Sequence, residues 1–188
     1  MDNRAKILDC ALHLFADQGY DAVGVQEIVD AAGITKPTLY HYFGSKHGLL
    51  EALLESYFTQ LNQAVRAAAV YDGHLPTTLH EVAAACFQYA RENPTFYRLQ
   101  LALWFAPRHS AGHQSVTRWQ MEQYQVIEEL FLQAAADHGN MRGRHRAYAV
   151  TFSGMINTYI GMALNGFAEL DETLLRQAVH QFQHGIYS

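Results

Sequence analysis

The sequence predicts an all-α protein in which a small three-helix head with a helix-turn-helix precedes a larger helical body. Nearly every segment places its apolar residues three or four positions apart, and no stretch alternates apolar and polar residues as a half-buried strand would. Hydrophobic residues make up 49% of the 188 and charged residues 16%, so the chain can bury a large core. Few prolines and no serine-rich or glycine-rich run interrupt the helical pattern.

The head contains three short helical segments, and a longer one follows. Glycine supplies their stops, and Ser45 can cap the longest of them. The helices are expected from Asp2 or Asn3 to Gly19, from Val25 to Gly33, from Thr35 to Phe43 and from Lys46 to about Val70. Further helices are expected at about 76–91, 94–104, 114–138, 143–168 and 172–186.

The turn between the second and third helices is the most informative feature. The second helix ends in Ala31-Ala32-Gly33, and a new helix starts after Ile34, which is expected to be buried in the turn. Small alanines let two helices approach at a steep angle, and Gly33 can supply a left-handed backbone conformation. This spacing predicts a helix-turn-helix, in which the second helix can enter the major groove of DNA.

Side chains on the third helix suit a nucleic acid. Leu39 and Phe43 are four apart and are expected to face inward, with Tyr40 either joining them or pointing outward. The residues left over offer a cation, hydroxyl groups and an imidazole for base edges and phosphates, namely Lys36, Thr38, Tyr40, His41 and Tyr42. Ser45 and Lys46 add a helix N-terminus and an ammonium, which together favour a phosphate.

At residues 7 to 50 the chain resembles the DNA-binding domain of the tetracycline-repressor (TetR) family. The strongest parts are LFADQGY, AAGITKPTLYHYF and the SK pair before a leucine-rich helix. The resemblance implies an all-α homodimer, with residues 1–46 as the helix-turn-helix DNA-binding domain and residues 47–188 as the ligand-binding and dimerisation domain. It implies a regulator that binds a palindromic operator and is released by a small-molecule inducer.

The resemblance also suggests which residues touch DNA. Gln26, Lys36, Thr38 and His41 match groove-facing positions, and Tyr40, Tyr42 and Lys46 match phosphate contacts; Thr35, the cap of the third helix, completes the predicted DNA-binding set. Gly24 departs from the family, which usually has Ser or Thr there. Glycine still caps a helix acceptably but lacks the hydroxyl that can touch a phosphate.

The body offers large apolar side chains that are either core or the lining of a ligand cavity. A lipophilic or aromatic inducer is therefore expected, with a few polar groups such as Gln125, Thr151 or Asn157. The predicted pocket residues are Phe58, Phe87, Trp104, Phe105, Met121, Tyr124, Gln125, Phe152, Met155 and Tyr159.

The last two helices predict a homodimer interface. The stretch 152–164 mixes glycines with large residues, and an apolar face runs from Leu174 to Phe182. Four such helices from two subunits can pack around a two-fold axis. Burial of both faces within one chain is the alternative.

Several classes of function are disfavoured. There is no catalytic motif, cofactor motif or metal motif, so we expect neither an enzyme nor a cofactor nor a metal, and the pairs His109/His113 and His180/His184 are expected to be surface histidines. No apolar run could span a membrane, and Cys10 and Cys86 are expected to be free thiols, so a cytoplasmic location is predicted. The net charge of −5 is unusual for a DNA-binding protein.

Two further alternatives stay open. An architectural or division-linked DNA-binding protein could use the same head, and the regulator could activate instead of repress.

Overall fold

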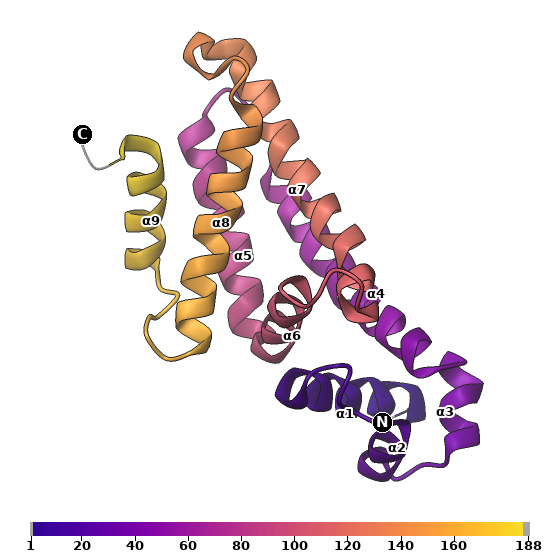
Figure 1. Ribbon diagram of the computed structural model, residues 1–188. Coiled ribbons are helices and arrows are strands. Elements are labelled where there is room, and N and C mark those ends of the chain that lie inside the picture. Colours follow the sequence, from indigo (N-terminus) through magenta and orange to yellow (C-terminus); the bar gives the residue numbers. More distant parts are fainter. Residues whose placement is uncertain (1, 186–188) are drawn as a thin grey trace. The chain divides into compact units, whose positions relative to one another are not determined.

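The computed structural model describes residues 2–185, and it is helical there with no strand (Figure 1). The all-α prediction is confirmed. The helices are α1 (Asn3–Gln18), α2 (Val25–Ala32), α3 (Lys36–Phe43), α4 (Lys46–Ala68), α5 (Leu75–Glu92), α6 (Pro94–Trp104), α7 (Ala111–Asp137), the 3₁₀ helix η1 (Gly139–Met141), α8 (His145–Leu164) and α9 (Glu172–His184).

The predicted boundaries differ from the observed ones mainly at the ends of two helices. α7 begins at Ala111, three residues before the expected start, and α8 ends at Leu164 instead of 168. Gly166 has φ +77°, a conformation that ends an α-helix, which explains the early stop. Met1 and residues 186–188, which belong to the predicted domains and in part to the last predicted helix, lie outside the described residues.

The chain divides into two compact units. Unit 1 comprises Met1–Thr59 and Pro94–Trp119, and unit 2 comprises Gln60–Asn93 and Gln120–Ser188. α4 and α7 are continuous helices that each contribute residues to both units. This division by compactness differs from the functional division predicted between residues 46 and 47, which stays a prediction.

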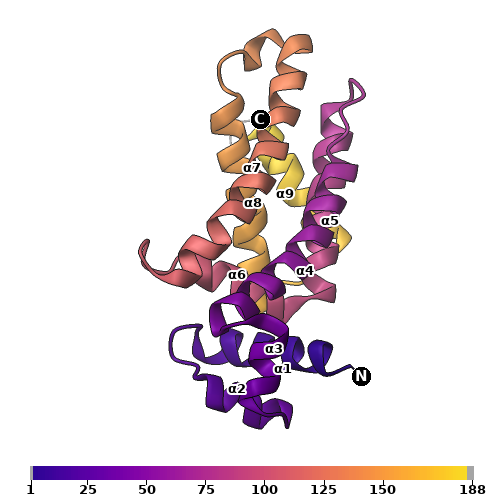
Figure 2. The same cartoon turned by 90° about the vertical axis from the view of Figure 1, so that its right-hand side faces the viewer.

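Unit 1 is built on α1, which contacts both α2 and α6, while α2 contacts α3 (Figure 2). Its apolar positions at helical spacing are fully buried, among them Ile7, Phe15, Ile28, Leu39 and Phe58. The Phe58 ring stacks on Trp119, with ring centroids 5.8 Å apart, and meets Phe96 edge-on at 5.2 Å. These aromatic contacts give the unit a rigid centre.

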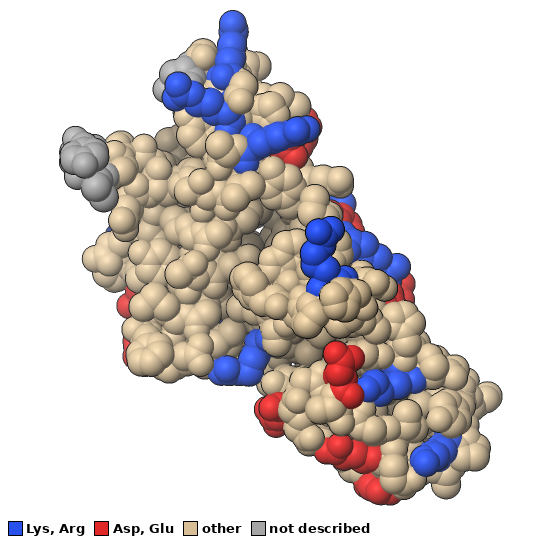
Figure 3. Space-filling view, in the orientation of Figure 1, with Lys and Arg blue, Asp and Glu red and all other residues tan. Residues whose placement is uncertain are grey.

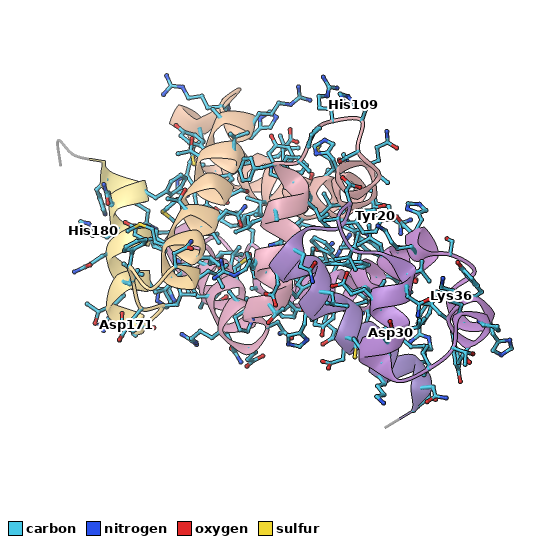
Figure 4. The ribbon with its side chains drawn as sticks, turned by 60° about the horizontal axis from the view of Figure 1, so that its bottom comes forward. Tyr20, Asp30, Lys36, His109, Asp171 and His180 are labelled. Atoms are coloured by element: carbon cyan, nitrogen blue, oxygen red, sulfur yellow. The ribbon has the colours of Figure 1, made fainter. Side chains whose placement is uncertain are left out.

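In unit 2, α5, α8 and α9 contact one another. Phe131, Phe152 and Phe182 form an aromatic cluster with ring centroids 5.0 to 6.0 Å apart. The N-terminus of α9 is capped by Asp171, whose Oδ1 accepts from the Leu174 N–H at 2.7 Å (Figure 4). Arg91 donates to the carbonyl of Leu170 just before that cap. Within residues 2–185, no helix has the length and apolar character needed to cross a bilayer.

Candidate nucleic-acid interface

The turn between α2 and α3 has the geometry that the sequence predicts. Gly33 is left-handed, with φ +59° and ψ 42°. The N–H groups of Gly33 and Ile34 donate back to the carbonyls of Asp30 and Val29 at 3.1 and 3.0 Å, which closes the end of α2. Thr35 is extended, so α3 begins at once in a new direction. Ile34 is half-buried, not enclosed as expected, because it lies at the edge of the turn.

α3 has one buried face and one exposed face. Leu39 is fully buried and Phe43 half-buried, with the Arg4 guanidinium 5.6 Å from the centre of the Phe43 ring. Tyr40 is 46% exposed, which excludes the core position that the sequence left open. The other predicted contact residues of this helix are exposed or, for Thr38, half-buried; they are Thr35, Lys36, Thr38, His41 and Tyr42.

The charge on α3 differs from that of the whole chain. Its eight residues include Lys36 and no Asp or Glu. The acidic side chains of α2 are held by neighbours: Gln26 Nε2 donates to Asp30 Oδ1 at 2.8 Å, and Gln18 donates to Glu27. Figure 4 shows Asp30 and Lys36 on the head, and Figure 3 shows acidic and basic side chains mixed on one face of it. α3 itself therefore offers a DNA phosphate one cation and no carboxylate, whereas the hydrogen-bonded carboxylates of Glu27 and Asp30 on α2 keep their negative charge.

Two hydroxyl groups at the start of α3 are held in place. Thr35 Oγ1 and Thr38 Oγ1 are 2.9 Å apart, within hydrogen-bond distance. The three aromatic rings at the other end also contact one another, with His41 and Tyr42 centroids 5.4 Å apart and Tyr42 and Phe43 centroids 6.1 Å apart. Contacts of this kind reduce the freedom of these side chains before any ligand binds.

The start of α4 is capped as predicted, since Ser45 Oγ accepts from the Gly48 N–H at 2.9 Å. Lys46 does more than the sequence indicated. Its ammonium donates to the carbonyls of Tyr20 and Val23 at 2.7 and 2.8 Å and lies 4.3 Å from the centre of the Tyr20 ring. Burial lowers the pKa of Lys46, and Asp21 opposes that shift.

Lys46 therefore ties the loop between α1 and α2 to the start of α4. Two of its three N–H donors are occupied by these carbonyls, so its predicted contact to a phosphate uses the third. That DNA contact stays a prediction. These two hydrogen bonds join Lys46 to residues that precede it by 26 and 23 positions, so no local pattern in the sequence could have revealed them.

The predicted ligand-pocket residues fall into both units. In unit 1, Phe58 is fully buried, Trp104 is half-buried against His113, and Phe105 is 81% exposed. In unit 2, Phe87 and Phe152 are buried, Tyr124, Met155 and Tyr159 are half-buried, and Met121 and Gln125 are exposed. Burial in a single chain does not decide which of them touches a ligand, and the set stays a prediction.

Gln125 lies in a groove on the outer side of unit 2. The groove has a volume of about 480 Å³ and is lined by side chains of α4 and α7, including the ion-paired Arg66 and Glu122, whose nitrogen and oxygen are 2.7 Å apart. Thr151, another polar candidate, is exposed and donates its hydroxyl to Ala147 of its own helix.

The buried polar side chains of the body are ones that the sequence reading missed. Asn62 is 3% exposed and Gln123 is 7% exposed. A signal was present, because Asn62 comes four residues after the buried Phe58 and Gln123 four residues before the buried Ile127. Each amide therefore interrupts the apolar stripe of its helix.

The histidine pairs have ordinary contacts. His113 shares a hydrogen bond with the carbonyl of Trp104 at 3.0 Å, and the rings of His180 and His184 lie 4.4 Å apart. Throughout the part of the chain that the structure describes, no three His, Cys, Asp or Glu side chains are grouped so as to hold a metal ion.

A tight helix-turn-helix whose second helix exposes a cation, hydroxyls and an imidazole places the chain among the helix-turn-helix DNA-binding proteins. Residues 7–53 match the family model for bacterial regulatory proteins of the tetR family. These residues form a DNA-binding domain of the tetR-family type, and the predicted resemblance is confirmed.

Curated relatives match part of the chain. The transcriptional activator FasR of Mycolicibacterium smegmatis is 35% identical over 98 residues, which are 52% of this chain and 45% of that protein. The transcriptional repressor KstR2 of Rhodococcus jostii is 41% identical over 58 residues, 31% of this chain and 28% of that protein. The matching part thus spans less than half the length of either relative.

Solved structures match nearly the full chain. The TetR-family regulator PfmR of Thermus thermophilus has a TM-score of 0.77 at 22% identity, covering 100% of this chain and 99% of that one. FadR of Bacillus subtilis, solved in complex with stearoyl-CoA, has a TM-score of 0.80 at 18% identity, covering 97% and 99%. At these identities the likeness establishes the fold of the body and not its ligand.

Proposed function

We propose that this protein is a ligand-responsive repressor that binds a palindromic operator as a homodimer and leaves it when a small lipophilic or aromatic inducer binds. In this proposal residues 1–46 bind DNA and residues 47–188 bind the inducer and the second subunit. The observation that carries the proposal is the exposed face of α3, which follows the helix-turn-helix turn and bears a lysine, hydroxyl groups and an imidazole but no carboxylate. Because such a regulator acts on the chromosome, we also propose a cytoplasmic location. We propose no enzyme activity.

The DNA contacts follow from the exposed side chains. Lys36, His41 and Thr38 lie on the recognition helix and are proposed to reach base edges together with Gln26. Thr35, Tyr40, Tyr42 and Lys46 are proposed to bind or orient phosphates. In a dimer the two recognition helices enter successive major grooves about 34 Å apart, so the operator has two inverted half-sites.

The direction of regulation is part of the proposal. KstR2 is named a repressor and FasR an activator, so proteins that match part of this chain include both kinds of regulator. A dimer that covers an operator beside its own gene blocks transcription by occupancy alone, and repression therefore needs no additional contact surface.

The response to an inducer requires a ligand that binds one arrangement of the dimer better than the other. The buried and half-buried aromatic residues of the body support a lipophilic ligand, and the complex of FadR with stearoyl-CoA supports a molecule with a long acyl chain. α4 is the proposed lever, because this continuous helix begins directly after the helix-turn-helix and ends in unit 2.

The proposed dimer interface is the outer face of α8 with α9. Val150 is 60% exposed and Met162 41% exposed on α8, and a Cβ added at Gly154 or Gly161 would meet nothing within 4 Å. The hydroxyl of Thr158 donates to the carbonyl of Gly154 in its own helix at 2.8 Å, so this hydroxyl needs no donor contact to a second subunit. The face drawn over α8 and α9 in Figure 3 is largely uncharged, which favours burial against a second copy.

The test is DNA binding to the intergenic region beside the protein's own gene, measured by fluorescence anisotropy over a salt series. We expect Lys36→Ala and Tyr42→Ala each to weaken specific binding by about tenfold, and Lys36→Ala to reduce the salt dependence by about one ion. Arg142→Ala is the matched control, since this exposed cation lies in unit 2. Binding with steep salt dependence but without sequence preference would favour the architectural alternative. A folded dimer that binds no DNA would refute the proposal.

A further inference from the structure

Two buried amide side chains in unit 2 have polar atoms without a hydrogen-bond partner. Neither Nδ2 nor Oδ1 of Asn62 has a hydrogen-bond partner among the described residues, and the same is true of Nε2 of Gln123. Both side chains are more than nine-tenths buried. Buried polar atoms in folded proteins are nearly always paired, because losing water without a replacement is unfavourable. These atoms are therefore available to a ligand.

The two amides come from facing sides of α4 and α7. Residues further along α4 contact residues further along α7. The contacts, in order, are the stacking of Phe58 on Trp119, the ion pair of Arg66 with Glu122, and the 2.9 Å hydrogen bond from Tyr71, just after α4, to Asp137 at the end of α7. The helices thus run in the same direction. Asn62 and Gln123 each lie four residues beyond the stacked pair, which places them on the same faces, one turn further along.

Apolar side chains are buried near the two amides on the same helices. Leu61 and Val65 of α4 are fully buried, and Ile127 and Leu130 of α7 are at most 2% exposed. The charged pair of Arg66 and Glu122 belongs to the exposed groove, with side chains 55% and 38% exposed. All buried polar side chains described for the chain are uncharged, being Asn62, Thr78, Gln100, Ser115, Gln120 and Gln123.

The donors and acceptors define the chemistry of a matching group. Asn62 offers an NH₂ donor and a carbonyl acceptor, and Gln123 offers an NH₂ donor. One carbonyl oxygen can accept from both NH₂ groups, while an adjacent N–H or O–H donates to Asn62 Oδ1. An ionised carboxylate or ammonium would be buried here without a counter-charge, which is strongly unfavourable.

We propose that Asn62 and Gln123 are the polar anchor of the inducer site and that they bind an uncharged carbonyl with a neighbouring N–H or O–H, such as a secondary amide, on a lipophilic chain. This inference rests on the proposed ligand-responsive function and names the chemical class of its ligand. The rest of the ligand lies along the apolar faces of α4 and α7.

The first measurement is the melting temperature of the ligand-free protein. Asn62→Leu replaces an unpaired amide with an apolar side chain of similar size, so we expect the melting temperature to rise by about 2–4 °C. Asn93→Leu is the matched control, because the half-buried Asn93 donates to the carbonyl of Tyr89 at 3.2 Å and its loss should lower the melting temperature. A lower melting temperature for Asn62→Leu would show that the amide has a structural partner and would overturn the proposal.

The second measurement is probe binding by calorimetry, with N-methyldecanamide, decanoate and decylamine as probes. We expect wild type to bind the amide at least about tenfold more tightly than either charged probe, and Asn62→Leu and Gln123→Leu to lose about tenfold in amide affinity. An equal preference in wild type, including no binding of any probe, would overturn the anchor. The operator-binding test is independent: DNA binding without the amide preference refutes the anchor alone, and the amide preference without DNA binding refutes the regulatory function alone.

Discussion

The recognition surface of α3 and the buried faces of α4 and α7 present their polar groups in opposite ways. On α3, polar side chains project from an eight-residue helix into solvent, and one buried leucine holds the helix to the head. On α4 and α7, Asn62 and Gln123 are enclosed among apolar residues. The first surface is set by spacing over fewer than 20 residues, whereas the second depends on two residues that are 61 positions apart in the chain.

The two surfaces would obtain their specificity for a ligand in different ways. A DNA-contacting surface has to be open and hydrated, so its polar residues need not be paired within the chain. A site for a lipophilic molecule has to exclude water, so each polar atom in it raises the free energy of the empty site and favours ligands that can pair with it. The same molecule can therefore recognise one ligand through exposure and another through enclosure.

The largest effect is expected from Gly48→Ala, which tests whether the head depends on local backbone geometry. A Cβ at Gly48 would lie 2.0 Å from the Phe43 carbonyl oxygen and 3.2 Å from its carbon, so the connection between α3 and α4 must shift. We expect a loss of about 3 kcal/mol or more in the free energy of unfolding, measured by urea denaturation, together with loss of specific DNA binding.

Gly24→Ala is the control for this substitution. Nothing lies within 4 Å of a Cβ there and its φ of −88° suits any residue, so we expect no clash and a loss of only about 1 kcal/mol, because alanine is a poorer N-cap than glycine. Equal stability of the two variants would mean that the junction between α3 and α4 yields easily, and that the head is less rigid than its contacts indicate.

Most of the fold could be predicted from the sequence because its signals are local. Gly33 marks the turn, Ser45 caps α4, and apolar stripes define the helices, each within a few residues. Exposure of the α3 residues followed from the same periodicity. The Lys46 tether to Tyr20 and Val23 and the close approach at Gly48 could not be predicted, since they depend on how separate elements meet.

Fewer features of the body could be predicted, because its candidate pocket residues were selected by residue type, mainly large apolar side chains. Phe105 is aromatic and apolar but 81% exposed, while the enclosed polar residues were overlooked. Periodicity identifies which face of a helix is apolar, but it does not distinguish core from a ligand site or from a subunit interface. An amide within an apolar stripe marks a position where burial leaves a polar group to be paired, which another aromatic residue does not.

An intermediate effect is expected at the proposed dimer interface from Val150→Glu. Val150 is 60% exposed in the single chain, so the fold should tolerate the change, but a charge buried between two subunits without a partner should weaken the dimer by about 2 kcal/mol or more. Sedimentation velocity over a concentration series measures this. Leu132→Glu is the control, because Leu132 is 48% exposed on α7, outside the last two helices. If Leu132→Glu alone separates the subunits, the interface lies elsewhere.

The smallest effect tests how well the body core excludes water. Burial raises the pKa of the Cys86 thiol from 9.0 to about 12, because the thiolate would lose its hydration in the core. The raised value means that the stabilising contribution is fully present below pH 9 and is lost as the pH rises towards about 12, since the unfolded chain releases this proton first. Between pH 9 and 10 the free energy of unfolding should fall by about 1 kcal/mol more in wild type than in Cys86→Ala. Urea denaturation at the two pH values measures this difference, with Cys10→Ala as the control because Cys10 is only half-buried. The same pH dependence in Cys86→Ala and wild type would show that water reaches the thiol, and the contrast between an open head and an enclosed body would then lose its physical basis.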